Sequence, residues 1–201
     1  LKHYFPVASW APAYARLLRS SYKAIKAADP NATVVSAGMP NFAWRDYAKL
    51  FRAGVRDRGY FDAVAVHPYT DTAADCVEIL GRVRRVLDAN GARKAPIWVT
   101  ETGWPSAQGK AKVLPQHRGW ITTPAGEATK LAAAYRAYAK NAKDLRLTRV
   151  YWYSWVSSDV RGGDAWDFAG LRTVGGDGSF VDKPALAAYR RVARSLRAAA
   201  R

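Results

Sequence analysis

Short apolar runs alternate with amphipathic helical segments along the chain, at a spacing of roughly 30 residues, the length of a strand–helix–strand crossover unit. Residues 61–66 and 96–99 are almost wholly apolar before each run ends in polar residues. Such runs indicate strands buried on both faces, as in a parallel sheet covered by helices. The units share no tandem sequence similarity, so the pattern favours crossover βα units over a solenoid repeat.

The alternation predicts an ordered series of elements. Helices are expected over residues 13–28, 44–58 and 75–89, over the segment that carries Leu131 to Tyr138, and from Pro184 onward. Strands are expected over residues 33–37, 61–69, 96–101 and 148–155. Long loops are expected over residues 105–123 and in the stretch rich in glycine and aspartate that follows residue 155. The sequence therefore predicts four βα units of an α/β protein.

Composition excludes several classes of protein. Of the 201 residues, 49% are hydrophobic and none of the apolar runs approaches the roughly 20 residues of a membrane helix, so neither a disordered chain nor a membrane partner is expected. A single cysteine, Cys76, and three scattered histidines give no disulfide framework or zinc signature. The glycines match neither a phosphate-binding loop nor a dinucleotide fingerprint, and no Gly-x-Ser-x-Gly elbow is present.

The net charge of +16 raises the question of a polyanionic partner. The basic residues do not cluster, because they are spread over the polar sides of three predicted helices. They are Arg16, Arg19, Lys23 and Lys26; Arg82, Arg84 and Arg85; and Arg190, Arg191, Arg194 and Arg197. We interpret them as solvated outer faces, and no nucleic-acid partner is expected.

Polar and aromatic residues gather where the predicted strands end. They are His67 and Tyr69, Glu101 and Trp104, and Trp152, Ser154 and Trp155. Because the carboxyl ends of parallel strands meet at one edge of the sheet, where α/β proteins place their chemistry, this distribution marks a site. A glutamate that ends an apolar strand is costly to bury unpaired, so Glu101 is expected to face polar partners or water at that edge.

The segment Trp-Val-Thr-Glu-Thr-Gly-Trp-Pro-Ser, residues 98–106, carries a family resemblance. It resembles the end of the seventh strand of clan A glycoside hydrolases, which are retaining (β/α)8-barrel enzymes with a glutamate nucleophile at that position. The Glu-Thr-Gly-Trp-Pro-Ser part is similar to the signature of family 17 β-glucanases, and the rest of the chain looks more like families 5 and 39. The resemblance implies that Glu101 is the catalytic nucleophile and that Trp104 binds substrate.

The flanking segments extend this resemblance. Residues 61–69 look like the sixth strand of the family, which implies that His67 and Tyr69 lie beside the nucleophile and that Tyr69 donates a hydrogen bond to it. A histidine satisfied within the core is the alternative for His67. Residues 151–155 resemble the eighth strand, where an indole forms the floor under the sugar. Trp152 and Trp155 have opposite strand parity, and we favour Trp152 as the floor while keeping both as substrate contacts, with plain core packing as the alternative.

Beyond these segments, residues 168–189 look like the closing part of the family's barrel, and Trp120 and Trp166 in the long loops are expected to line more distant subsites. The resemblance thus implies an α/β fold, a (β/α)8 TIM barrel of which residues 1–201 form the C-terminal portion, from helix 4 to helix 8. Its acid/base glutamate, in an Asn-Glu-Pro motif, is expected upstream of Leu1. The missing N-terminal half of the barrel is then an expected partner.

These implications predict a retaining glycoside hydrolase that cleaves a β-linked poly- or oligosaccharide such as a glucan, xylan or mannan. Such an enzyme needs two carboxyl groups about 5–5.5 Å apart, of which this chain supplies Glu101. Its mechanism requires no metal or organic cofactor, so none is expected. A polymeric carbohydrate substrate favours an extracellular, secreted protein. Two alternatives stay open: a non-catalytic carbohydrate-binding relic, and a basic scaffold that binds an acidic polymer.

Overall fold

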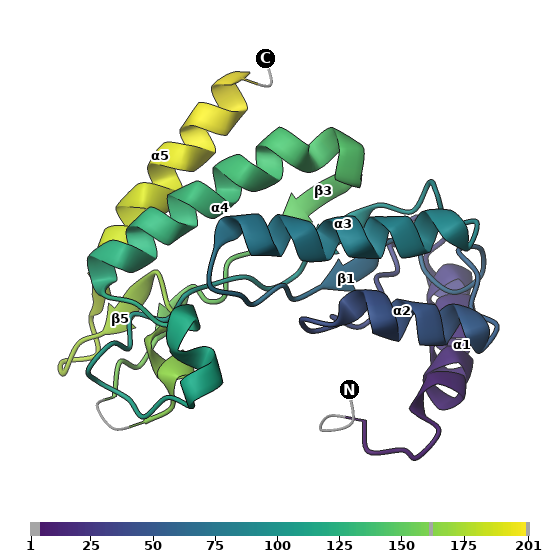
Figure 1. Cartoon of the computed structure of the whole chain (residues 1–201), viewed down its shortest axis with the longest axis horizontal. Helices are drawn as coiled ribbons and strands as arrows, with labels where there is room; N and C mark the ends of the chain where they lie inside the picture. The colour runs from purple at the N-terminus through teal and green to yellow at the C-terminus, as the bar shows by residue number, and fades with distance from the viewer. Residues whose placement is uncertain (1–4, 161–162, 200–201) are drawn as a thin grey trace. The chain divides into compact units, whose positions relative to one another are not determined.

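The computed structural model describes residues 5–160 and 163–199, and within them the chain forms five α-helices and two three-stranded sheets (Figure 1). The chain divides into two compact units. Unit 1 comprises the chain up to Pro68 together with Glu78–Thr100 and Ala142–Val150. Unit 2 comprises Tyr69–Val77, Glu101–Asn141 and the chain from Tyr151 onward.

The helices lie where the apolar periodicity predicts them. They are α1 (Trp10–Ala28), α2 (Ala43–Arg52), α3 (Ala73–Ala89), α4 (Pro124–Leu145) and α5 (Pro184–Ala199). Only α2 is clearly shorter than the prediction of residues 44–58. Gly54 follows it with a φ of 91°, a left-handed conformation that glycine adopts without strain, and the N–H of Val55 donates back to the carbonyl of Leu50. The helix therefore ends at Arg52, six residues before the predicted end.

Unit 1 is built on a parallel sheet of β1 (Val64–Val66), β2 (Ile97–Val99) and β3 (Leu147–Val150), in the order β1-β2-β3. All three residues of β1 are buried, and Val64 pairs with Ile97 in register. The apolar runs thus correctly predict parallel strands, with β1 buried on both faces and Trp98 of β2 only partly buried. The strand predicted over residues 33–37 is reduced to isolated parallel bridges, from Val35 to Ala63 and from Met39 to Val66.

The prediction of half a (β/α)8 barrel is wrong. The second sheet consists of β4 (Val156–Ser157), β5 (Arg172–Val174) and β6 (Phe180–Asp182), and its β5–β6 pair is antiparallel. The two small sheets are separate and neither is closed, whereas a barrel needs one continuous circle of paired strands. The protein is a mixed α/β structure. An apolar run shows that a strand is buried, but it does not show how many strands pair beside it.

One basic side chain departs from the predicted solvated faces. Arg84 on α3 is only 6% exposed. Its guanidinium donates to the carbonyl oxygens of Ala92 and Ala95, both at 2.8 Å, and to the carboxylate of Asp88 at 2.9 Å. The interpretation of a solvated face is therefore wrong for Arg84, which holds the connection between α3 and β2.

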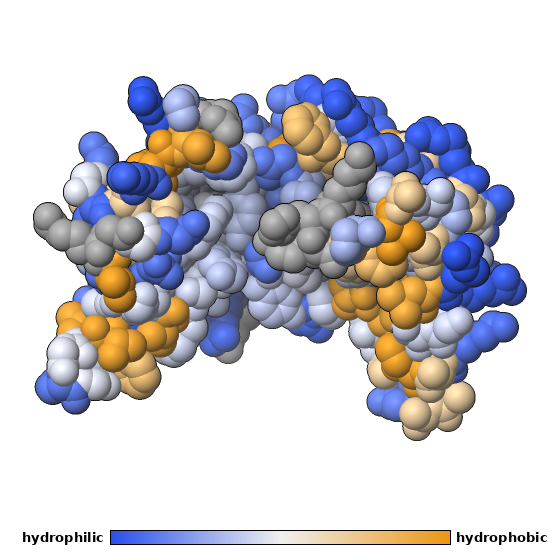
Figure 2. Space-filling view, turned by 90° about the horizontal axis from the view of Figure 1, so that it is seen from below, coloured by the Kyte–Doolittle hydropathy of each residue, from blue (hydrophilic) through white to orange (hydrophobic). Residues whose placement is uncertain are grey.

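In unit 2, α4 and α5 lie side by side and enclose a small core (Figure 1). Its buried members are Leu131, Leu171, Ala185, Leu186, Ala188 and Val192. By contrast, Val174, Phe180 and Val181 on β5 and β6 are 42–56% exposed, and Figure 2 shows hydrophobic surface on this unit, at the left of the view. Among the described residues, none of the helices has the length and apolar character to cross a membrane.

Candidate active site

Glu101 follows β2 by two residues, where the apolar run gives way to polar side chains, and it is half-buried in unit 2. The hydroxyl of Tyr69 donates a hydrogen bond to its carboxylate, with 2.9 Å between the two oxygens. Burial, reinforced by the nearby Glu101, raises the pKa of Tyr69 above its ordinary value. The phenol is therefore a fixed hydrogen-bond donor to Glu101 rather than a source of protons.

Aromatic rings surround Tyr69. Trp120 stacks on it, with 6.2 Å between ring centroids and 27° between planes. Trp166 meets it edge to face at 4.6 Å. Each tryptophan contacts a further ring: His117 stacks on Trp120 at 4.1 Å, and Tyr153 meets Trp166 at 5.8 Å. Tyr69 is thus held between two indoles while its hydroxyl points to Glu101.

Two short 3-10 helices carry these indoles. The first, η1, spans Pro115–Trp120, and the second, η2, spans Ala165–Phe168. At the start of η2 the side chain of Asp164 accepts from the N–H of Trp166, and the side chain of Asp167 accepts from the N–H of Asp164. This reciprocal cap satisfies N–H groups that have no partner within such a short helix, and so fixes the segment that carries Trp166.

Trp104 and Trp152 contact the chain segments that carry these aromatic rings. Trp104 is 1% exposed, and its indole N–H donates to the carbonyl of Thr70 at 2.7 Å, directly beside Tyr69 in the chain. Trp152 packs 6.1 Å from Trp104 and against the core between α4 and α5, and its N–H donates to Ala169. Trp104 thus supports the site from within, whereas Trp152 is partly buried and packs against both Trp104 and the core.

Gly103 allows the backbone to pack closely at this point. A Cβ added there would lie 2.5 Å from the carbonyl oxygen of Tyr153, closer than side chains tolerate. The N–H of Tyr153 also donates to the carbonyl of Thr102 at 2.9 Å. The chain on either side of Gly103 therefore holds both Glu101 and the backbone of Tyr153.

The other predicted site residues have different surroundings. His67 belongs to unit 1, where its Nε2 lies 2.9 Å from the hydroxyl of Thr100 and its ring packs against Gly38, at which a Cβ would not fit. Trp155 is 56% exposed in unit 2, with the guanidinium of Arg172 5.9 Å from its ring. The bond between Tyr69 and Glu101 is the contact within the predicted set that the resemblance anticipated.

The predicted strand over residues 148–155 is wrong beyond Val150, where β3 ends. Strand parity therefore does not decide between Trp152 and Trp155. The ring of this segment that contacts Trp166 is Tyr153, which is 38% exposed. Trp120 and Trp166, expected at distant subsites, contact Tyr69 directly. The Trp-Tyr-Ser-Trp run signals aromatic richness here, but nothing in it selects Tyr153.

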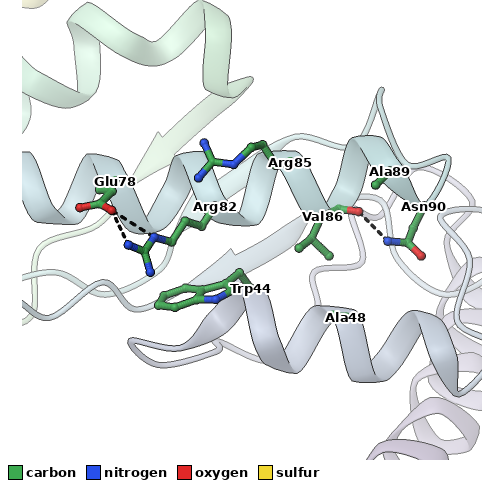
Figure 3. Close-up of a pocket in the computed structure, with 8 residues that line it drawn as sticks. All are labelled: Trp44, Ala48, Glu78, Arg82, Arg85, Val86, Ala89 and Asn90. Atoms are coloured by element: carbon green, nitrogen blue, oxygen red, sulfur yellow. Dashed lines mark hydrogen bonds and ion pairs between the residues drawn. The ribbon is translucent and has the colours of Figure 1, made fainter.

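Other parts of the described structure offer less chemistry. Within residues 5–160 and 163–199, no three His, Cys, Asp or Glu side chains gather closely enough to hold a metal ion. A groove of about 500 Å³ lies between α2 and α3 of unit 1. Figure 3 shows the residues that line it. There the guanidinium of Arg82 lies 4.7 Å over the ring of Trp44 and binds the carboxylate of Glu78. The groove's carboxylate and indole face are thus already engaged.

The hydrogen bond from Tyr69 orients the Glu101 carboxylate beside aromatic surfaces. A carboxylate in such a setting can attack an electrophilic carbon or bind a hydroxyl-rich ligand. Comparison with models of known protein families and with curated proteins finds no match to this chain. The function is therefore argued from the site.

Proposed function

We propose that the protein is a retaining glycoside hydrolase acting on a β-linked poly- or oligosaccharide, with Glu101 as its nucleophile. The observation that carries the proposal is the 2.9 Å hydrogen bond from Tyr69 to the Glu101 carboxylate. A hydrogen bond donated to a carboxylate favours its charged form, which is the form that attacks an anomeric carbon. The same bond fixes the direction in which the carboxylate faces.

The aromatic residues supply surfaces for a sugar. Trp120 and Trp166 are partly exposed, and Tyr153 is 38% exposed. Flat aromatic faces pack on the C–H faces of pyranose rings, so these three rings are proposed to contact the sugars on either side of the bond that is cleaved. Trp104 and Trp152 then act indirectly, by holding the segments that carry Tyr69 and Tyr153.

In the proposed reaction, the Glu101 carboxylate attacks the anomeric carbon while the glycosidic C–O bond breaks, which leaves a covalent glycosyl ester. A second carboxyl group protonates the departing oxygen and later removes a proton from the water that hydrolyses the ester. The acid/base role requires a second carboxyl group about 5–5.5 Å from that of Glu101.

A fluorosugar with an activated leaving group tests the nucleophile without the acid/base residue. Dinitrophenolate departs without protonation, and a 2-fluoro substituent slows hydrolysis of the ester. Incubation with dinitrophenyl 2-deoxy-2-fluoro-β-glucoside, and separately with the xyloside and mannoside, is expected to add one fluoroglycosyl group per chain. Intact mass spectrometry followed by peptide mapping should place the group on Glu101, and the preferred sugar reports the substrate class.

Matched variants decide the assignment. Glu101→Gln keeps the shape and removes the attacking charge, so labelling should fall by about 10³-fold or more. Glu78→Gln removes an exposed carboxylate that is paired with Arg82 in unit 1 and should label like wild type. Labelling of Glu101→Gln at the wild-type rate, or of another carboxylate in the wild type, contradicts the proposed function.

A further inference from the structure

Lys130 on α4 connects the two chain segments that bear Tyr69 and Trp120. Its ammonium group donates to the backbone carbonyl of Asp71, two residues beyond Tyr69. It also donates, at 3.4 Å, to the backbone carbonyl of Gly119, which directly precedes Trp120. One side chain therefore holds both segments at positions adjacent to the stacked rings.

The two segments already lie in close contact at this point. A Cβ added to Gly119 would lie 2.0–2.3 Å from the carboxylate atoms of Asp71, so no larger residue fits at position 119 without displacing that side chain. Beneath them, the ammonium group of Lys130 lies 5.5 Å from the centroid of the Trp104 ring. Trp104 in turn holds Thr70 through its N–H. Lys130 thus sits where three structural elements meet.

One of the two carbonyls that accept from Lys130 belongs to Gly119, so Lys130 bears directly on the position of Trp120. Hydrogen bonds from an ammonium group are roughly twice as strong as those between neutral groups, and cation–π contacts add to them. The segment after Tyr69 has further support from Trp104. By contrast, η1 is a single short 3-10 helix, and such helices have poorer hydrogen-bond geometry than α-helices. Lys130 therefore supplies a side-chain donor to the residue before Trp120, whereas the Tyr69 segment has a second side-chain donor in Trp104.

We propose that Lys130 is a positioning residue that fixes the ring of Trp120 against the ring of Tyr69 in the candidate active site. The consequence for catalysis rests on the proposed function. Because Trp166 and Trp104 still hold the Tyr69 segment, loss of Lys130 is expected to weaken sugar binding while leaving the hydrogen bond to Glu101 in place. The predicted signature is a change in binding rather than in the chemical step.

Lys130→Met tests this proposal, because it keeps the length of the side chain and removes its donors. Acrylamide quenching of tryptophan fluorescence should show one indole more exposed than in wild type. Since the chain has eight tryptophans, the measurement is repeated in a Trp120→Phe background, where the Lys130→Met change should no longer alter quenching. Lys140→Met, an exposed position on the same helix, is the matched control and should leave quenching unchanged.

In fluorosugar labelling, Lys130→Met should raise the concentration for half-maximal rate about tenfold, or about 1.4 kcal/mol, while the maximal rate changes less than about threefold. Lys130→Arg retains several donors and should restore both wild-type quenching and wild-type binding; it also serves if the Met variant does not fold. Unchanged quenching in a folded Lys130→Met protein overturns the proposal, as does an equal loss in binding and in maximal rate.

The two proposals fail in different ways. If the quenching difference depends on Trp120 but no sugar labels the wild type, Lys130 positions Trp120 and the proposed function is wrong. If Glu101 is labelled normally in both Lys130→Met and Lys130→Arg, and acrylamide quenching of Trp120 is unchanged, the proposed function stands and the role of Lys130 is rejected.

Discussion

Among the described residues, each unit contains one nearly buried basic side chain that holds a connecting segment, and the two have different hydrogen-bond partners. In unit 1, Arg84 binds two backbone carbonyls and the half-exposed Asp88. In unit 2, Lys183 is 7% exposed, donates to the carbonyl of Phe168 at 2.7 Å, and lies 3.1 Å from the carboxylate of Glu127, which is fully buried. Asp159 lies 3.9 Å from the same ammonium group.

The contacts of Arg84 and those of Lys183 respond differently to pH. A guanidinium does not titrate in proteins, and its carbonyl acceptors carry no proton, so the Arg84 connection is insensitive to pH near neutrality. Burial raises the pKa of Glu127 to about 7, against the opposing effects of Lys183 and Ser106. Because Phe168 ends η2, the helix that carries Trp166, the segment beside the candidate active site depends on a titrating pair. The segment held by Arg84 does not.

The largest expected effect follows from removing Lys183. Lys183→Met leaves the Glu127 carboxylate buried without its cation, which should lower the free energy of unfolding by about 3–5 kcal/mol at pH 8. Glu127 has a pKa above its unfolded value of 4.5, so its favourable contribution is complete below pH 4.5 and is lost as pH rises through the folded pKa. The variant should therefore be less destabilised at pH 5, as urea unfolding at both pH values will measure.

Glu127→Gln provides the control for that comparison. Without a titrating group at position 127, the stability difference between pH 5 and pH 8 should be smaller than in wild type. The double variant Glu127→Gln, Lys183→Met removes both charges and should recover part of the stability lost in Lys183→Met. If Lys183→Met loses equal stability at both pH values, the buried carboxylate is not the cause.

The corresponding variant of unit 1 should show a smaller effect without pH dependence. Arg84→Met leaves the carbonyls of Ala92 and Ala95 without their donor, at an expected cost of about 2–3 kcal/mol. Arg85→Met, at the next and exposed position of α3, should change stability by less than about 0.5 kcal/mol. If Arg84→Met and Arg85→Met lower the free energy of unfolding equally, the buried role of Arg84 is wrong. If the loss in Arg84→Met differs markedly between pH 5 and pH 8, the two units do not differ in pH dependence.

Sequence alone predicted the parts of the molecule that local patterns determine. Apolar periodicity located all five helices, and the runs at residues 61–66 and 96–99 correctly indicated parallel buried strands. The family resemblance predicted the hydrogen bond between Tyr69 and Glu101. The two residues follow β1 and β2, which are adjacent parallel strands. These features depend on neighbours in the chain or in one sheet, which an amino-acid pattern records.

The errors concern features that depend on distant parts of the chain. Whether a sheet closes depends on the number of its strands and their register, which the apolar runs do not specify. The burial of Arg84 depends on carbonyls in a loop, whereas its spacing in α3 resembles that of the exposed arginines beside it. Trp120 and Trp166 lie in long segments that accept hydrogen bonds from Lys130 and Lys183 and, at Trp166, donate to the cap at Asp164. Loop contacts of this kind have no periodicity to detect.

The smallest expected effect concerns Asp62, a partly exposed acidic residue that connects α1 to the chain after it in unit 1. Its carboxylate accepts from Lys26 at 2.8 Å, from the N–H of Val34 at 2.7 Å and from Tyr22 at 3.2 Å. Burial opposes ionisation, but the hydrogen bonds from Lys26 and Val34 outweigh it and lower the pKa of Asp62.

Asp62→Asn keeps the size of the side chain and removes the charge, so the expected loss is about 1 kcal/mol at pH 7 because solvent screens the pair. A lowered folded pKa gives stability that is present above the unfolded pKa and is lost as pH falls through the folded value. The difference between wild type and variant should therefore shrink below about pH 4, the reverse of the trend at Glu127. Denaturant titrations from pH 3 to pH 7 measure it, and a difference that grows toward low pH would show that Asp62 gains nothing from its donors.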